Sequence, residues 1–252
     1  MKKHSITGGA LLLLNLTGIL RADAPPAANA AFNSYSNAVA LRLDEQHRSL
    51  TAFLAPAGTP GCPGDLNIER LTPATRPEYA GALLHHWRGT AFAPGVQAAD
   101  FERLLRNFNA YPQYFSPQVV AARLLVHEGD HLQAWLRVRQ KHVITVMLDT
   151  TYDVTFGQLD PHHRYSTSQS NRIAEVDSAP GEEHGFLWRL NTFWSWEERD
   201  GGLCLQIEAI SLTRSIPRGL EWAIGRYVES IPRESLEFTL RAGRDALERT
   251  KQ

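Results

Sequence analysis

The amino-acid sequence predicts an α+β protein in which one helix precedes a series of antiparallel strands and a long helix closes the chain. Apolar residues recur at helical spacing from Ser36 to Leu54. From about Pro117 to Arg214, turn-like clusters separate runs rich in Val, Ile, Thr, Tyr and Trp, which is typical of a meander of long strands. Helical spacing returns past Pro217.

The first 24 residues have the features of a secretory signal. Lys2 and Lys3 supply positive charge, an apolar run covers residues 10–20, and the small-x-small triplet "ADA" ends at Ala24. The run is too short to span a bilayer, and no later segment is apolar enough to do so. We therefore expect cleavage after Ala24, a mature chain that begins at Pro25, and a periplasmic or secreted protein.

Composition excludes one class of partner. Of the 252 residues, 43% are hydrophobic and 21% are charged, and the formal net charge is −1. A chain of this size can bury about 70% of its unfolded surface, which is enough for one substantial core. No basic tail or stripe dominates, so no nucleic-acid partner is expected.

The elements before the meander follow from spacing and turn residues. Residues 25–31 are rich in Pro and Ala and are expected to form a flexible lead-in to the first helix. The segment 56–65 contains enough Pro and Gly to end that helix in a loop. Alternating polar and apolar residues then predict strands at 65–71 and 81–95.

Three further helices are predicted. Asp100 is expected to cap a helix over residues 100–115, whose apolar side chains share one face. After Pro217, a helix over 217–230 is followed by a second one, in which Pro232 occupies the first turn. The apolar stripe of that last helix consists of Leu236, Leu240, Gly243 and Leu247.

The stretch "HEGDH" at 127–131 matches the H-E-x-x-H signature of zinc peptidases, in which two histidines on one helix face bind one ion. Here Gly129 and Asp130 form a turn pair between the histidines, and the residues after the motif alternate with a period of two. We therefore predict a hairpin tip. His85 and His86 are neighbours in a predicted strand and must point to opposite faces, so no metal and no other cofactor is expected.

The two cysteines, Cys62 and Cys204, lie in different contexts. The first is in a Pro/Gly loop and the second is in a strand-like run. An oxidising compartment would permit a disulfide, but these contexts favour two separate thiols.

Aromatic residues gather in "FLWRLNTFWSWEE" at 186–198, where large apolar side chains alternate with polar ones. These rings either fill a core or line a ligand cavity, and both interpretations remain open. In the neighbouring run "CLQIEAISL", Glu208 is an acid within an apolar strand. If it points inward it needs a partner such as an arginine, and its pKa would then be perturbed.

A basic row is expected along one strand face, formed by Arg137, Arg139 and Lys141. The simpler interpretation is a solvated edge whose charges pair with Asp149 and Asp153 on the next strand. The alternative is a transient contact with anionic headgroups of a membrane.

The order of helix, many antiparallel strands and long C-terminal helix resembles the START-like superfamily, also called SRPBCC or polyketide-cyclase-like. Three segments carry the likeness: "HHWRGTAFAPGVQAADFERLLRNFNAYPQYFSP" at 85–117, "RYSTSQSNRIAEV" at 164–176, and the run from "GFLWRLNTFWSW" to "RAGR" at 185–244. The resemblance covers residues 65–252, and segment 25–64 is an added N-terminal helical extension.

This resemblance implies a helix-grip fold, in which a curved antiparallel sheet wraps around the long C-terminal helix and encloses a cavity. Members of the superfamily bind lipids, sterols, polyketides or other apolar molecules, and they share no universal catalytic motif. We therefore expect a hydrophobic small molecule or lipid to be bound without turnover. The alternatives are a cyclase- or hydrolase-type enzyme that uses the same cavity, and a partner-binding protein with a filled interior. The expected wall residues are Trp87, Tyr152, Trp188 and Trp194, and the expected polar contacts are Glu208 and Arg214.

Overall fold

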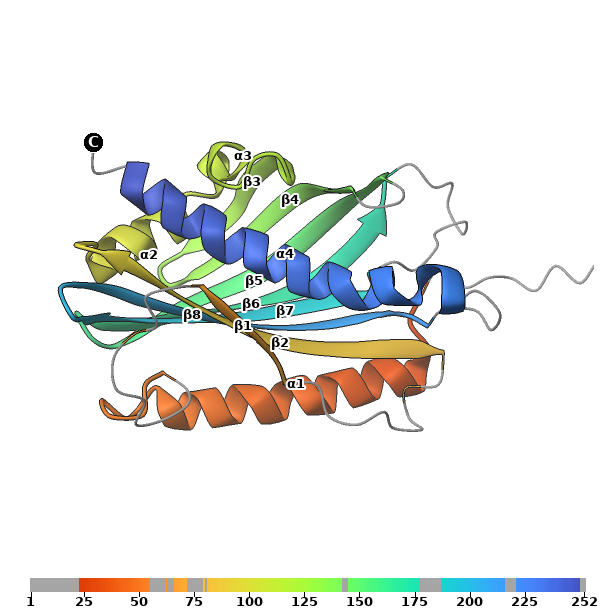
Figure 1. The fold of residues 1–252 in the computed structure, drawn as a ribbon, viewed down its shortest axis with the longest axis horizontal. Helices are drawn as coiled ribbons and strands as arrows, with labels where there is room; N and C mark the ends of the chain where they lie inside the picture. Colours follow the sequence, from red (N-terminus) through yellow and green to blue (C-terminus); the bar gives the residue numbers. More distant parts are fainter. Residues whose placement is uncertain are drawn as a thin grey trace, which may run out of the picture.

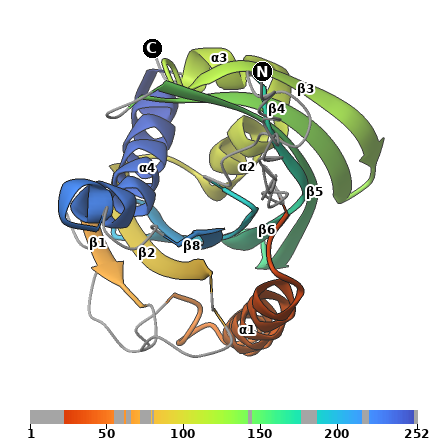
Figure 2. The same ribbon diagram turned by 90° about the vertical axis from the view of Figure 1, so that its right-hand side faces the viewer.

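The computed structural model describes residues 23–54, 62, 66–71, 79, 81–141, 145–176, 187–215 and 221–249, without the side chains of 221–229. Within these residues, eight strands form one sheet in the order β1-β2-β8-β7-β6-β5-β4-β3. The sheet curves around helix α4, and helix α1 lies against its other face (Figures 1 and 2). The elements are α1 (Pro26–Gln46), β1 (Asn67–Arg70), β2 (Ala82–Pro94), α2 (Ala98–Arg106), η2 (Phe108–Ala110), α3 (Tyr111–Tyr114), β3 (Val119–Glu128), β4 (His131–Lys141), β5 (Thr145–Asp160), β6 (His163–Glu175), β7 (Arg189–Arg199), β8 (Gly202–Arg214) and α4 (Glu221–Arg249).

The predicted meander is confirmed, because each strand from β3 to β8 pairs antiparallel with the next. The hairpin at the zinc-peptidase-like motif is confirmed as well. Glu128 pairs with His131 across the tip, and Gly129 adopts a φ of 62°, a left-handed conformation that glycine adopts without steric cost.

Strand β2 closes the sheet by pairing with β8 along its whole length, from Ala82 opposite Arg214 to Pro94 opposite Gly202. Helix α4 packs across these strands on the concave face. A Cβ on Gly89 would lie 2.9 Å from Cδ1 of Ile68 and 3.0 Å from Cδ2 of Leu240. Glycine at this position therefore lets the helix approach the sheet closely.

The sheet separates two hydrophobic cores. The cavity-side core lies between the concave face and helices α2 and α4, and it includes the fully buried Phe101, Trp196 and Leu240. The α1-side core lies between the convex face and α1, and it includes Phe32 and Ile210, both with an exposed fraction of 0%.

The N-terminal prediction is wrong in detail. Residues 25–31 are not a flexible lead-in, because α1 begins at Pro26 and ends at Gln46 rather than at Leu54. Proline is well suited to the first helical turn, where its missing N–H has no partner to lose. Ala28 and Phe32 from this first part are completely buried against the sheet.

Two other helix predictions also need correction. The helix expected over 100–115 is broken at Asn107, whose ψ of 64° leaves the helical region, and its N-cap is Gln97 rather than Asp100. Conversely, the two helices expected after Pro217 are one helix, α4, with Pro232 in its interior. An interior proline costs about 3 kcal/mol, so the packing of α4 on the sheet must offset that cost.

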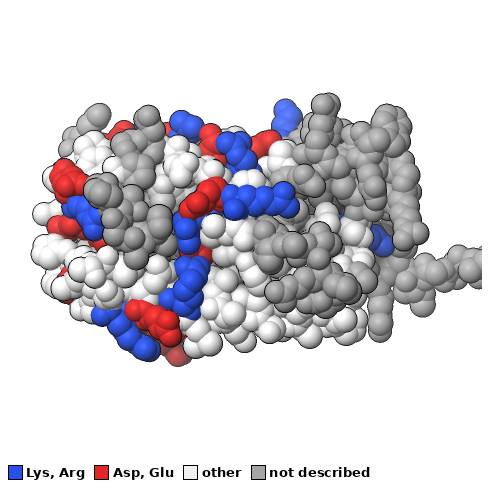
Figure 3. Space-filling view, turned by 60° about the horizontal axis from the view of Figure 1, so that its bottom comes forward, with Lys and Arg blue, Asp and Glu red and all other residues white. Residues whose placement is uncertain are grey.

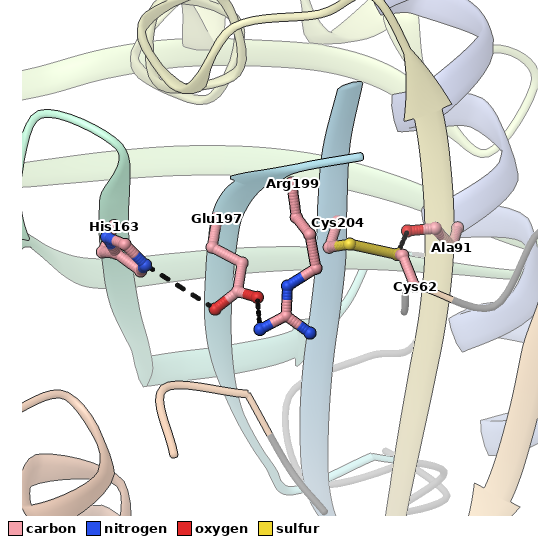
Figure 4. The surroundings of a disulfide bond; sticks show 6 residues. All are labelled: Cys62, Ala91, His163, Glu197, Arg199 and Cys204. Atoms are coloured by element: carbon pink, nitrogen blue, oxygen red, sulfur yellow. Dashed lines mark hydrogen bonds and ion pairs between the residues drawn. A yellow bond between two sulfur atoms is a disulfide. The ribbon is translucent and has the colours of Figure 1, made fainter. Parts of the chain in front are cut away.

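The separate thiols favoured by the sequence are also contradicted. Cys62 and Cys204 form a disulfide, and their Cα atoms lie 5.7 Å apart (Figure 4). The Sγ atom of Cys62 also lies 3.5 Å from the carbonyl oxygen of Ala91. The fold brings Cys62 beside β8 although 142 residues separate the two cysteines, and local sequence context carries no information about this approach.

Candidate ligand cavity

A cavity of about 200 Å³ lies between the concave face of the sheet and α4. Its floor comes from strands β4 to β8, its roof from α4, and one end from the helical segment between α2 and β3. Apolar and aromatic side chains dominate the wall, as in most small-molecule sites. The lining residues are Leu105, Phe108, Tyr111, Phe115, Gln118, Val119, Leu136, Val138, Gln140, Tyr152, Val154, Phe156, Ser166, Ser168, Leu190, Thr192, Trp194, Ile207, Ser235, Phe238 and Thr239.

Strand alternation places the aromatic wall. Leu190, Thr192 and Trp194 of β7 face the cavity, because side chains two residues apart share one face of a sheet. The ring of Trp194 packs edge-to-face on Phe101 of α2, with centroids 5.1 Å apart. Trp196 continues the row beyond the cavity and donates its indole N–H to the carbonyl of Ala98 at 3.0 Å.

Hydroxyl groups supply most of the polarity of the wall. Ser166, Ser168 and Thr192 line the floor, and their hydroxyls have no hydrogen-bond partner among the described residues. On the roof, Oγ of Ser235 is buried and also lacks a described partner. By contrast, Thr239 donates its hydroxyl to the carbonyl of Ser235 at 2.8 Å.

Two tyrosines and the amides of Gln118 and Gln140 complete the polar groups. Burial raises the pKa of Tyr152 to about 12, although its hydrogen bond to Thr150 acts in the opposite direction. Burial also raises the pKa of Tyr111, whose hydroxyl donates to the carbonyl of Leu105 at 2.7 Å. Both side chains are therefore neutral at physiological pH.

The lining residues that the structure describes include no carboxylate, imidazole, thiol, ammonium or guanidinium group. General acid–base catalysis usually relies on such groups, with pKa values near the working pH. Nor do the described residues contain a cluster of three or more His, Cys, Asp or Glu that could hold a metal ion.

The structure brings together two of the residues selected from the sequence, since Tyr152 and Trp194 both line the cavity. Trp87 packs on the cavity-side core but lies outside the lining, with Arg70 stacked 5.9 Å from its ring. Arg214 is half-buried at the end of β8 and is likewise outside the lining.

Trp188 and Glu208 lie away from the cavity. Trp188 packs against the α1-side core. Glu208 has an exposed fraction of 1% and contacts α1 through Arg42, whereas its neighbour Ile207 faces the cavity. The two faces alternate along β8, and the local sequence does not indicate which face carries the cavity.

Glu208 does have the arginine partner that its burial requires. Arg88 donates to Oε1 of Glu208 from Nε at 3.0 Å and from a terminal nitrogen at 2.9 Å. Nε2 of His86 lies 2.9 Å from Oε2, and Nδ1 of the same ring lies 2.9 Å from the hydroxyl of Tyr35 on α1. Burial alone would raise the pKa of Glu208, but the hydrogen bond to His86 and the charges of Arg88 and Arg42 lower it to about 2.

A serine–histidine pair also lies on the α1 side. Oγ of Ser195 is 2.7 Å from Nε2 of His47, and both residues are buried. The imidazole stacks on Tyr165 with centroids 4.1 Å apart, and Phe53 covers it at 5.0 Å. Burial lowers the pKa of His47 to about 4. The pair therefore forms part of the packing between α1 and the sheet.

The expected basic row is confirmed in part. Arg137 forms an ion pair with Asp149, with nitrogen and oxygen 2.7 Å apart. Asp153 instead accepts a hydrogen bond from Gln133 at 3.1 Å. On the coloured part of the surface in Figure 3, which shows the α1 side of the molecule, basic and acidic side chains are interspersed. None of the described helices is long and apolar enough to cross a membrane.

The free serine hydroxyls of the floor were missed by the sequence interpretation. Their signal was present in "RYSTSQS", where Ser166, Ser168 and Ser170 recur with a period of two on one strand. Ser170 is used structurally, since its Oγ accepts the backbone N–H of Leu190 at 2.9 Å. Only the other two are left to face the cavity.

No protein-family model matches the chain, and no curated protein matches it by sequence. Solved structures do match. The Zhui aromatase/cyclase from Streptomyces sp. R1128 superimposes with a TM-score of 0.51 at 13% identity, over 68% of this chain and 97% of that one. The protein TTHA0849 from Thermus thermophilus gives 0.50 at 11%, over 66% and 98%. A STAR-related lipid transfer protein from Xanthomonas axonopodis gives 0.48 at 19%, over 72% and 98%.

At these identities the likeness concerns the fold. The curved antiparallel sheet, the C-terminal helix in its grip and the added N-terminal helix confirm the START-like helix-grip architecture predicted from the sequence. Activity must be argued from the site itself.

Proposed function

We propose that the protein binds a small hydrophobic molecule between the sheet and α4 and does not transform it. The observation that carries this proposal is the cavity of about 200 Å³, whose described wall is apolar and aromatic with a few neutral hydroxyls. Apolar enclosure supplies affinity by removing nonpolar surface from water, and placed polar groups supply orientation.

The cavity volume limits the size of the occupant. An apolar cavity of about 150 Å³ is sufficient for benzene. A volume of about 200 Å³ therefore favours a molecule of one or two rings, or a short acyl chain, over an entire two-chain lipid. Larger lipids would require α4 and the sheet to separate.

The alternative function is that of a cyclase- or hydrolase-type enzyme. One of the similar solved structures is that of a Streptomyces aromatase/cyclase, and its name is compatible with this alternative. Such an enzyme needs two polar groups that converge on a reacting atom, with at least one able to exchange a proton. Among the described lining residues only Tyr111 and Tyr152 titrate, and burial raises the pKa of both, which favours the binding proposal.

We also propose that the protein is exported. The disulfide between Cys62 and Cys204 supports this, since such bonds persist in oxidising compartments. The start of α1 at Pro26 is also compatible with cleavage after Ala24, because the helix would remain complete. N-terminal sequencing of the protein from the extracytoplasmic fraction should give Pro25 as the first residue, and a chain that retains Met1 would refute export by cleavage.

Native mass spectrometry of gently purified protein tests the binding proposal. We expect a bound small-molecule mass that disappears in the variant Val154→Trp, whose ring would fill the cavity from β5. The matched control is Thr155→Trp, on the exposed face of the same strand, which should retain the bound mass. Wild-type protein without a bound mass, and unable to take up naphthalene or 2-naphthol, would contradict the proposal.

A further inference from the structure

The floor of the cavity carries a short row of hydroxyl groups. Ser166 and Ser168 are alternate residues of β6, and Ser168 lies directly opposite Thr192 of β7 in the sheet register. Side chains opposed in this way have Cβ atoms about 5 Å apart. The hydroxyls of Ser168 and Thr192 can therefore reach the same atom of a bound molecule. We call Ser166, Ser168 and Thr192 the hydroxyl row.

The hydroxyl row forms no hydrogen bond with the part of the chain that the structure describes. None of its three hydroxyls has a partner among the described residues, and Oγ of Ser235 on the opposite wall is buried without one. Most buried polar groups in folded proteins are paired. On the other side of β7, the side-chain N–H of Asn191 donates to Ser36 at 2.7 Å, although Oδ1 of Asn191 has no partner among the described residues.

The described wall of the cavity also holds no group that could neutralise a charge. The described lining residues contain no Lys, Arg, His, Asp or Glu. Arg88 of β2, which lies opposite Glu208 in the sheet register, forms ion pairs with Glu208 and Glu69. An ion enclosed by this wall would lose its hydration without gaining a counter-charge.

We infer that the bound molecule is uncharged and carries at least one oxygen that hydrogen-bonds to the hydroxyl row. The class is that of phenols, alcohols, ketones and esters with one or two rings or a short chain. Free carboxylic acids and charged headgroups are excluded from the cavity. This inference rests on the proposed binding function and specifies its ligand chemistry.

Three probes of matched shape test it at pH 7, namely 2-naphthol, naphthalene and 2-naphthoate. Titration of the wild-type protein by fluorescence or calorimetry should show that 2-naphthol binds about three- to tenfold tighter than naphthalene, because one hydrogen bond is gained. The naphthoate anion should bind at least about 100-fold more weakly than 2-naphthol, because its charge is buried without a partner.

The double variant Ser166→Ala/Ser168→Ala should remove the preference of 2-naphthol over naphthalene and leave naphthalene binding unchanged or tighter. The control is Thr167→Ala, which lies between the two serines and projects to the opposite face of β6. It should bind all three probes as the wild type does.

The outcomes separate this inference from the proposed function. Naphthoate binding as tight as that of 2-naphthol would overturn the inference while leaving a ligand-binding protein. Naphthalene binding as tight as that of 2-naphthol would show that the hydroxyl row forms no hydrogen bond with the bound molecule. Failure of all three probes, together with the absence of a co-purifying mass, would overturn the binding function and this inference with it.

Discussion

The two faces of the sheet differ in the hydrogen-bond partners of their polar side chains. On the convex face, polar side chains of β7 find partners on or just after α1: Asn191 bonds to Ser36, and Ser195 bonds to His47. On the concave face, the hydroxyls of Ser168 and Thr192 find none among the described residues. The same strands supply both sets. The hydrogen bonds of Asn191 and Ser195 fix α1 to the sheet, although Oδ1 of Asn191 and Nδ1 of His47 are buried there without a described partner.

The convex face also buries charge, whereas the described cavity wall does not. Arg88, Arg42 and His86 surround Glu208, so the carboxylate exchanges its hydration for several charge-assisted contacts. Arg42 comes from α1, which ties the network to the helix. This arrangement makes the α1 side well defined and costly to disturb, while the cavity side can adapt to an occupant.

Truncation of one aromatic side chain on each side tests this difference most strongly. Phe32→Ala should lower the free energy of unfolding by about 4 kcal/mol, because a completely buried ring leaves a void in the α1-side core. Phe238→Ala, on the cavity wall, should cost roughly 1 kcal/mol because its ring already borders free volume. Urea unfolding measures both, and equal losses would contradict the comparison.

His47 on the α1 side and Tyr152 on the cavity side should make stability depend on pH at opposite ends of the scale. The pKa of His47 is about 4 in the folded protein and 6.5 in the unfolded chain. Between these values the unfolded chain binds a proton that the folded protein does not, so stability is present above pH 6.5 and is lost as the pH falls through 4. The loss should be roughly 3 kcal/mol for this residue.

His85 and Glu208 change stability in the same direction, since their folded pKa values are lowered to about 4 and about 2. A variant is therefore needed to isolate His47. His47→Gln should make unfolding free energy less dependent on pH between 6.5 and 4, and His127→Gln at the exposed hairpin tip should not. An unchanged pH dependence in His47→Gln would refute the assignment.

The cavity side should weaken in alkali. The folded pKa of Tyr152 is raised to about 12, so the stability it contributes is present below pH 10 and is lost as the pH rises through 12. Tyr152→Phe should reduce the alkaline loss of stability, with the share of Tyr111 remaining, and should leave the acid loss unchanged, as measured by urea unfolding across the pH range.

Removal of one arginine from the buried network should have a smaller effect. Arg88→Met should cost about 2 kcal/mol, because Glu208 loses two hydrogen bonds but keeps Arg42 and His86. The control Arg103→Met breaks an exposed pair with Asp100 and should cost less than about 1 kcal/mol. Similar losses in both variants would show that the network does not stabilise the α1 side.

The smallest expected effect comes from the same substitution, serine to alanine, made on two helices. Ser36→Ala should cost about 1 kcal/mol, since it leaves the amide of Asn191 buried without a partner. Ser235→Ala should be neutral or stabilise by about 0.5 kcal/mol, since Oγ of Ser235 has no described partner and alanine favours helices. A loss in Ser235→Ala as large as that in Ser36→Ala would mean that the roof hydroxyl is bonded after all.

Sequence patterns predicted the structure best where a feature depends only on residues that are close together in the chain. The alternation after the HEGDH motif predicted the hairpin, because a turn pair and a period of two describe backbone geometry directly. The same rule placed His85 and His86 on opposite faces of β2, where His85 contacts Thr213 and His86 contacts Glu208. Where a local rule competed with packing it failed, as for Pro232, which favoured a helix start but lies inside α4.

Two residues of the candidate site were predicted from local sequence patterns in the same way. Trp194 and Tyr152 were found because large aromatic rings in strands are usually buried, and both face the cavity. Trp188 was expected there for the same reason and Glu208 as a polar contact, yet Glu208 is buried and Trp188 is half-buried on the other side of the sheet. A strand pattern separates two sets of side chains but does not say which element covers each set.

The sequence by itself determined the order of helices and strands, the alternation within each strand and the need of Glu208 for an arginine. These follow from backbone periodicity and from the cost of burying a charge, and both act over a few residues. Only the tertiary structure decided that α1 covers the convex face, that Cys62 meets Cys204, and that the hydroxyl row faces the cavity. Each of these features depends on contacts between segments far apart in the chain. Such contacts are decided by how the chain reverses direction and how its elements pack together.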